Sequence, residues 1–409
     1  MFYVSRGNVP HKRHTQHRAA DGALYAEELF GVEGFTGRSS LLYHLVPPTR
    51  THRVEPVEAP QLALEEADDG YHHHRLIDSV AVPPSGDAIT GRIPLFFNND
   101  VVMGVVRPAT PMPDGVFYRN GEADEMLFVH EGSGLLDTVF GPIPYGPGDY
   151  LVLPIGTTWR LDPDPGSAQR MLYLEAPSEI EPPKRYRNEY GQLLEHSPYS
   201  QRDIDAPDEV VPRAETGEFV IQVRSTDRIT AYRYRHHPFD LVGWDGYLWP
   251  FRFNIANFQP ITGRVHQPPP VHQTFQARNF VVCSFVPRKF DYHPLAIPAP
   301  YNHSNINSDE VIYYVAGNFM SRRGVEVASF TLHPAGIPHG PHPGTVEASI
   351  GKEATEELAV MVDTFRPLRI TRQAAGLDDP RYPYSWLPAP DASGEAQALA
   401  ERGPEAFPD

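Results

Sequence analysis

Short hydrophobic runs separated by turn-forming residues follow one another along most of the chain. The clearest runs occupy residues 126–129, 149–153, 280–282, 311–315 and 358–362. They are rich in β-branched and aromatic residues, which pack well on a pleated surface, and glycine or proline lies between them. None of these runs approaches the length of a membrane-spanning helix. The pattern predicts a mainly β protein.

The composition favours the same class. The chain of 409 residues contains 44 prolines and 32 glycines, and they show no collagen-like repeat. Proline interrupts helix interiors and central strands but is tolerated in turns and at sheet edges. A hydrophobic fraction of 40% is sufficient to build buried cores. These features favour β-sandwiches or barrels over helical bundles.

Two β-rich blocks suggest how the chain is divided. The first extends from about residue 93 to 174, and the second from about 263 to 365. We expect an N-terminal β domain of residues 1–262, in which a charged linker of about residues 179–212 follows the first block. A C-terminal domain of residues 263–375 and a Pro/Ala-rich tail of residues 376–409 complete this division.

The two blocks also share a spaced pattern of residues. In the second block, His303 is followed by Glu310, Gly317 and a Pro-x-Gly-x-x-His turn that ends at His339. In the first block the matching positions are Tyr118, Glu125, Gly132 and a similar turn that ends at Trp159. The shared spacing predicts duplication of one small barrel. Only the C-terminal copy retains the two histidines, so we expect the N-terminal barrel to be degenerate and the C-terminal barrel to bind metal.

His303, Glu310 and His339 together offer two imidazoles and one carboxylate. This ligand set leaves three coordination positions open and is the facial triad of non-haem Fe(II) oxygenases. A structural zinc site would need four closed ligands, usually thiolates, and the chain has only Cys283. Asp309 is a rival carboxylate, but Glu125 in the first block matches the spacing of Glu310.

The charge balance restricts the partners. With 35 Lys and Arg against 52 Asp and Glu, the formal net charge is −17. Such a chain has no general electrostatic attraction to nucleic acid or to anionic membranes. The N-terminal residues lack the apolar core of a signal peptide, so we expect a cytoplasmic protein. An anionic substrate would require a locally basic pocket, for which the candidates are Arg288, Lys289, Arg322, Arg323 and His342.

Longer motifs give the chain a family resemblance. The spaced metal motif resembles that of the cupin superfamily, in which barrels are jelly rolls. The chain further resembles homogentisate 1,2-dioxygenases from about residue 11 to 375. The segments that carry this likeness are 24–27, 34–36, 239–244, 272–275, Leu332-His333-Pro334 and Pro338-His339-Gly340-Pro341.

The resemblance implies an Fe(II) enzyme that converts homogentisate and O2 to maleylacetoacetate in tyrosine and phenylalanine catabolism. It implies His303, Glu310 and His339 as the iron ligands. It places Tyr301 and His333 near the substrate. His339 is a further candidate for substrate contact, and so is Arg322, because a guanidinium can hold a carboxylate. The family's acid/base histidine corresponds to His272 or His266, with His272 preferred, because a histidine pKa near neutrality suits proton transfer from a phenol. The family also forms homo-oligomers, namely hexamers built as dimers of trimers.

One departure keeps other functions open. Phe319 stands where the family tends to place a tyrosine, so the contacts to the substrate side chain differ. A related cupin dioxygenase acting on gentisate or on a hydroquinone is the nearest alternative. A cupin isomerase that uses zinc or manganese on a sugar phosphate is another, and a metal-free storage or regulatory protein is a third.

Overall fold

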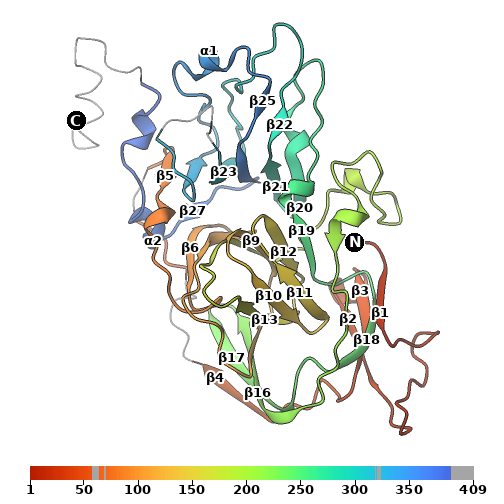
Figure 1. The fold of residues 1–409 in the computed structure, drawn as a ribbon. Helices are drawn as coiled ribbons and strands as arrows, with labels where there is room; N and C mark the ends of the chain where they lie inside the picture. The colour runs from red at the N-terminus through yellow and green to blue at the C-terminus, as the bar shows by residue number, and fades with distance from the viewer. Residues whose placement is uncertain (58–63, 69–70, 318, 320–323, 388–409) are drawn as a thin grey trace. The chain divides into compact units, whose positions relative to one another are not determined.

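The computed structural model describes residues 1–57, 64–68, 71–317, 319 and 324–387. Strands dominate these residues, so the predicted mainly β class is confirmed. The chain divides into two compact units (Figure 1). Unit 1 contains residues 1–64, 84–93 and 100–257, and unit 2 contains residues 65–83, 94–99 and 258–409. Among the described residues, no helix combines the length and the hydropathy needed to cross a membrane.

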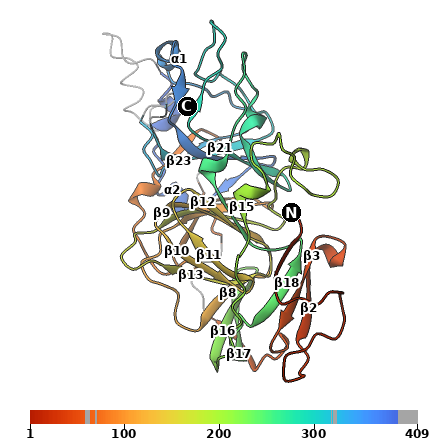
Figure 2. The same ribbon diagram turned by 45° about the vertical axis from the view of Figure 1, so that its right-hand side comes forward.

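Unit 1 consists of three groups of hydrogen-bonded strands. A four-stranded sheet has the order β1-β18-β3-β2, of which Figure 2 labels β18, β3 and β2, and a seven-stranded sheet has the order β11-β10-β13-β8-β16-β17-β4. The strands β15-β19-β12-β9-β14-β7 form the third group in that order. The bounds are β1 (Val4–Gly7), β2 (Ala26–Gly31), β3 (Ser39–His44), β4 (Arg53–Val57), β7 (Val102–Val106), β8 (Val116–Asn120), β9 (Asp124–Glu131), β10 (Gly134–Thr138), β11 (Gly141–Tyr145), β12 (Asp149–Leu153), β13 (Thr158–Pro163), β14 (Arg170–Ala176), β15 (Ile204–Asp205), β16 (Thr216–Ser225), β17 (Arg228–His236), β18 (Leu241–Gly246) and β19 (Phe251–Asn254).

The core of unit 1 lies between its two larger groups of strands. Leu127 of β9 and Leu151 of β12 belong to the same buried cluster as Leu136 of β10 and Trp159 of β13. Alternate residues of a strand point to opposite faces, so each sheet contributes one apolar face to this cluster. The result is a β-sandwich. The expected linker of residues 179–212 belongs to unit 1 and contains the 3₁₀ turns η3 (Lys184–Tyr186) and η4 (Gln201–Asp203).

Unit 2 is built around a six-stranded sheet of order β20-β21-β26-β23-β24-β5. Its strands are β5 (Arg75–Ile77), β20 (Gln273–Ala277), β21 (Phe280–Phe285), β23 (Asp309–Ala316), β24 (Phe330–His333) and β26 (Leu358–Thr364). Beside it, β22 (Arg288–Lys289) pairs with β25 (Ala354–Thr355), and β27 (Arg369–Ile370) pairs with the end of β6 (Arg92–Phe97). The short helices are α1 (Thr345–Ser349), α2 (Arg372–Ala375), η2 (Ser79–Ala81), η6 (Pro269–His272) and η7 (Tyr382–Tyr384).

The observed division differs from the expected domains at two places. Residues 65–83 and 94–99 fall in unit 2, although the sequence suggested one domain of residues 1–262. Strand pairing is the reason, because β5 adds to the edge of β24 and β27 bonds to Phe96 and Phe97. The expected tail of residues 376–409 also begins later, since Tyr382 is buried and Trp386 donates a hydrogen bond to the Gly340 carbonyl oxygen. Residues 388–409 lie outside the described part of the chain.

The two units share a strand arrangement around the matching glutamates. Each glutamate is the second residue of its strand and lies opposite one residue on each neighbouring strand. These triplets are Leu153, Glu125 and Glu175 in unit 1, and His333, Glu310 and Asp363 in unit 2. Gly132 and Gly317, seven residues further on, both adopt a positive φ, of 101° and 92°, which glycine tolerates best. This agreement favours the duplication, which itself stays a prediction.

In unit 1 an arginine binds the matching glutamate. Arg92 Nη1 donates to Glu125 Oε1 at 2.6 Å and to Glu175 Oε1 at 2.5 Å. The guanidinium carbon lies 5.6 and 5.9 Å from the ring centroids of Tyr118 and Trp159, and Trp159 Nε1 donates to Glu125 Oε2 at 3.0 Å. Fixed organic cations therefore neutralise the buried carboxylates here, since Arg224 also binds Glu175, and no metal ion is needed for that purpose.

We expect Arg92→Met to destabilise the protein by about 3–5 kcal/mol, because it leaves the buried Glu125 without a cation. Glu175, in contrast, keeps its contact with Arg224. The double variant Arg92→Met/Glu125→Gln should regain much of the loss, since the amide is neutral. Arg228→Met, at a position whose side chain is 86% exposed, should change the free energy of unfolding by less than about 0.5 kcal/mol. Urea denaturation measures all three, and a loss in Arg92→Met no larger than in Arg228→Met would contradict this account.

Candidate metal centre and its cavity

Strand β23 positions Glu310 at the centre of the unit 2 sheet. Glu310, Ile312 and Tyr314 alternate along the strand, so their side chains share one face, and all three line a cavity of about 190 Å³. Val311 and Tyr313 point to the opposite face and are buried there. The continuous hydrophobic sequence of β23 therefore reflects a strand that is covered on both faces.

The backbone holds the two histidines next to each other. His303 precedes β23 and His339 follows β24, and the two residues form an isolated antiparallel bridge. His303 N donates to His339 O at 2.8 Å, and His339 N donates to His303 O at 2.9 Å. Their ring centroids lie 4.2 Å apart. This pair of hydrogen bonds fixes the spacing of two side chains that are 36 residues apart in the chain.

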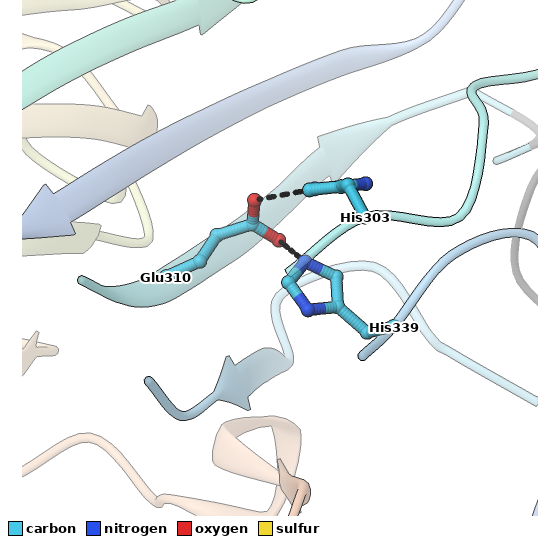
Figure 3. Close-up of side chains that lie close together, drawn as sticks. All are labelled: His303, Glu310 and His339. Atoms are coloured by element: carbon cyan, nitrogen blue, oxygen red, sulfur yellow. Dashed lines mark ion pairs between the residues drawn. The ribbon is translucent and has the colours of Figure 1, made fainter. Parts of the chain in front are cut away.

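The three side chains converge on one point (Figure 3). Their ligand atoms all lie within 4.8 Å of one another. Glu310 turns one oxygen toward each ring, with His303 Nε2 3.8 Å from Oε2 and His339 Nε2 3.4 Å from Oε1. Neither ring nitrogen of the buried His339 has a hydrogen-bond partner among the described residues. Buried imidazole nitrogens are rarely left without a partner, so this arrangement fits a divalent transition metal.

Electrostatics keep Glu310 ready to bind a cation. Burial alone would raise its pKa, but contacts with His303, His333 and His339 outweigh burial and hold the pKa well below the ordinary value. Asp363 lies opposite Glu310 on β26, and burial, followed by the Glu310 charge, raises the pKa of Asp363 to about 8. The carboxyl pair therefore holds one negative charge at neutral pH. Asp363 was not identified from the sequence, although its match in unit 1, Glu175, also faces the matching glutamate.

The rival carboxylate Asp309 has a structural role. Its Oδ1 accepts a hydrogen bond from Ala335 N at 2.7 Å, and its Oδ2 accepts one from Leu368 N at 2.6 Å. The side chain thus ties together the segments that follow β24 and β26, and Asp309 is not part of the three-residue cluster. Asp124 makes the same two kinds of contact in unit 1, to Ile155 N and Ile180 N.

His333 lies behind the ligands, whereas the resemblance placed it near the substrate. Its ring is fully buried, donates from Nδ1 to Glu310 Oε1 at 2.7 Å, and stacks on His339 with centroids 4.5 Å apart. Its Nε2 lies 3.1 Å from the Tyr382 hydroxyl. His333 is absent from the described residues that line the cavity. In this position it orients the carboxylate, as outer-shell partners of metal ligands do.

The cavity beside the cluster is mainly apolar and aromatic. Its volume exceeds the roughly 150 Å³ that suffices to hold benzene. The wall residues come from the sheet face and from the loops around residues 261–300. The aromatic and apolar members include Phe285, Phe290, Ile312, Tyr314, Phe319 and Met361, and the polar members include His266, His272, Arg288, Lys289, Asp291, His303, Glu310 and Glu357.

Both acid/base candidates line this cavity, but their surroundings differ. His272 ends η6 and is buried, and burial, followed by the charges of Arg288 and His266, lowers its pKa to about 3. His266 is more exposed and its Nδ1 lies 3.7 Å from Asp291 Oδ2. His272 is therefore a neutral hydrogen-bond acceptor over the physiological pH range.

None of the other predicted substrate residues, Tyr301, His339 and Arg322, is among the described residues that line the cavity. Tyr301 is half exposed and is not among the described cavity residues, although its ring lies against His303 and its carbonyl oxygen lies 3.0 Å from His303 Nδ1. Arg322 and Arg323 lie outside the described residues. Phe319 lines the cavity and packs edge-on against Tyr314. Its position offers no hydroxyl to a ligand.

The chain is similar to known proteins over most of its length. It is 43% identical over 393 residues to a protein of Saccharolobus solfataricus named "Putative dioxygenase SSO1533", across 94% of this chain and 99% of that protein. It is 26% identical over 421 residues to the homogentisate 1,2-dioxygenase of Rhodopseudomonas palustris, across 93% of this chain and 90% of that protein. No protein-family profile matches the chain. A cupin 2 conserved barrel domain protein from Leptotrichia buccalis covers 74% of the chain and matches over its own full length, with 9% identity and a TM-score of 0.34.

We expect anaerobic loading with Fe(II) to give one metal ion per chain by elemental analysis, because Arg92 fills the matching position in unit 1. Glu310→Gln and His339→Ala should each lower metal affinity by more than the roughly 10–100-fold typical of outer-shell changes. His14→Ala, which removes a histidine whose side chain is 96% exposed, is the matched control and should keep one ion. Two ions per chain, or full loading of the Glu310 variant, would refute this assignment.

Proposed function

The chain belongs to the dioxygenase family of its Saccharolobus relative, and we propose that it is an Fe(II)-dependent enzyme that opens the ring of a para-dihydroxylated aromatic acid, with homogentisate as the first candidate. The observation that carries this proposal is the meeting of His303, Glu310 and His339 beside an aromatic-lined cavity, whose wall includes His303 and Glu310. The likeness to a homogentisate 1,2-dioxygenase over 93% of the chain supports the substrate class.

The proposed reaction balances without a further reductant. Homogentisate and O2 combine to give maleylacetoacetate, both oxygen atoms enter the product, and one ring bond breaks. His303, Glu310 and His339 would hold the iron, which when bound supplies the Lewis acidity and the one-electron chemistry that allow O2 to react with an aromatic ring. The side chains around the cavity bind and orient the ring and keep water away from it.

We assign His272 as the residue that accepts the proton of a ring hydroxyl. It is buried in the cavity wall, so it can act on a ligand from which bulk water is excluded. Its low pKa makes it neutral at physiological pH, as a proton acceptor must be, and binding of an anion would make its protonated form less unfavourable. His266 lies nearer to solvent and faces Asp291, and this position favours a role at the cavity mouth.

A second substrate class follows from Phe319. Because this side chain presents only carbon to the cavity, it selects a flat apolar surface on the ligand and supplies no hydrogen bond. Gentisate or a plain hydroquinone would meet the same iron ligands and the same aromatic walls. Family membership favours any of these ring cleavages over the isomerase alternative. The homo-oligomer expected from the resemblance stays a prediction.

Oxygen uptake by anaerobically Fe(II)-loaded protein tests the proposal, with homogentisate, gentisate and hydroquinone offered separately. We expect iron-dependent uptake that is fastest with homogentisate, with one O2 consumed per ring opened. His339→Ala should abolish it, because the metal is no longer held, whereas His14→Ala should retain it. Uptake with gentisate or hydroquinone alone would make that compound the substrate in place of homogentisate. No uptake with any of the three would overturn the proposed function.

His272→Gln should lower kcat/KM for the preferred diphenol by about 10²–10⁴-fold, because the amide cannot take up a proton. The metal content should stay at the wild-type level, which separates this effect from loss of iron. His266→Gln is the matched variant on the same loop, and its effect should be at least tenfold smaller. A larger loss of kcat/KM in His266→Gln than in His272→Gln would assign the acid/base role to His266 instead.

A further inference from the structure

One cation in the cavity wall, Arg288, has no ion-pair partner among the described residues. Arg288 is the first residue of β22 and pairs with Thr355 of β25, and its side chain lines the same cavity as His303 and Glu310. No described residue forms an ion pair or a side-chain hydrogen bond with its guanidinium group, which packs only over the ring of Phe290 at 5.8 Å.

Two buried arginines among the described residues are paired with carboxylates. Arg75 donates to Asp378 at 2.6 Å, and Arg92 contacts two glutamates. Around Arg288 the carboxylates of Asp291 and Glu357 line the cavity but remain beyond ion-pair distance of it. Asp291 is directed elsewhere, since its Oδ1 accepts a hydrogen bond from Gly263 N and its Oδ2 faces His266. A half-buried guanidinium that has no ion-pair partner among the described residues is incompletely satisfied, so a ligand anion is a natural partner.

We propose that Arg288 binds the carboxylate of the aromatic substrate while the hydroxylated end of the ring lies toward His303 and Glu310, an inference that rests on the proposed function. The planar guanidinium offers two parallel donors that match a carboxylate. The same cavity wall includes Phe285, Ile312, Phe319 and Met361, which offer apolar surface to the ring. The ligand class is therefore an aromatic acid with ring hydroxyls and one carboxylate.

This assignment also explains how a strongly acidic chain attracts an anion. The net charge of −17 repels such a substrate at long range, so a short-range cation inside a low-dielectric cavity must compensate. A bound carboxylate would in turn cancel the positive charge that His272 experiences from Arg288. Substrate binding and proton acceptance would thus be coupled through one side chain.

The test compares homogentisate with its methyl ester, which has the same ring but no charge. For the wild-type, Fe(II)-loaded protein we expect the acid to be favoured by about 10- to 100-fold in kcat/KM, the usual effect of a charge-assisted hydrogen-bonded pair. Arg288→Met should raise KM for the acid by that factor and leave the ester nearly unchanged, so the preference disappears. Arg288→Lys keeps the charge but lacks the two parallel donors, so its KM for the acid should lie between those of the wild type and Arg288→Met. Arg372→Met, at a position whose side chain is 70% exposed, should match the wild type.

Calorimetric titration under anaerobic conditions separates this proposal from the function. If no diphenol supports oxygen uptake, binding of the acid and the ester to metal-loaded protein still tests Arg288. Tighter binding of the acid that is lost in Arg288→Met would support the anion site although the reaction were wrong. Equal affinity of wild type for acid and ester, or equal weakening of both in Arg288→Met and Arg288→Lys, would overturn the role of Arg288.

Discussion

The buried carboxylate of Glu310 is the constraint on which the rest of unit 2 depends. A carboxylate inside a β-sheet is costly unless cationic or donor groups surround it. His333 donates a hydrogen bond to one carboxylate oxygen, and His303 and His339 place ring nitrogens 3.8 and 3.4 Å from the carboxylate oxygens. The backbone bridge between the last two residues fixes that approach. The same contacts that make the charge tolerable leave two imidazole nitrogens and one carboxylate facing a common point, which is what a metal ion requires.

Unit 1 solves the same electrostatic problem in another way. Its matching glutamate, Glu125, is satisfied by the guanidinium of Arg92 and by the indole of Trp159. These groups fill the space that two imidazoles and an ion could otherwise occupy, and they are covalently part of the chain. The strand pairings around Glu125 and Glu310 match, so the difference between a structural core and a candidate metal centre comes from a few side chains on one framework.

The cavity beside Glu310 separates two chemical environments. Its wall includes two of the candidate metal ligands, His303 and Glu310, and also Arg288, a cation that has no ion-pair partner among the described residues. Aromatic and aliphatic side chains also line this cavity. Such an arrangement favours a flat ligand with polar groups at both ends, because each end then meets a group that is otherwise incompletely satisfied. The acidic surface of the chain makes this local cation more consequential for an anionic ligand.

The sequence by itself determined the mainly β class, the strands around residues 126, 150, 281, 313 and 360, and the cluster of His303, Glu310 and His339. Periodicity along the chain predicts such strands, because it reflects which face of a strand each residue occupies, and the spacing shared by the two blocks marked the three residues of the cluster. Only the tertiary structure placed His333 behind Glu310, brought Asp363 opposite it, and moved residues 65–83 into unit 2. Contacts between strands far apart in sequence decide these positions, and spacing along one chain does not encode which edges will pair.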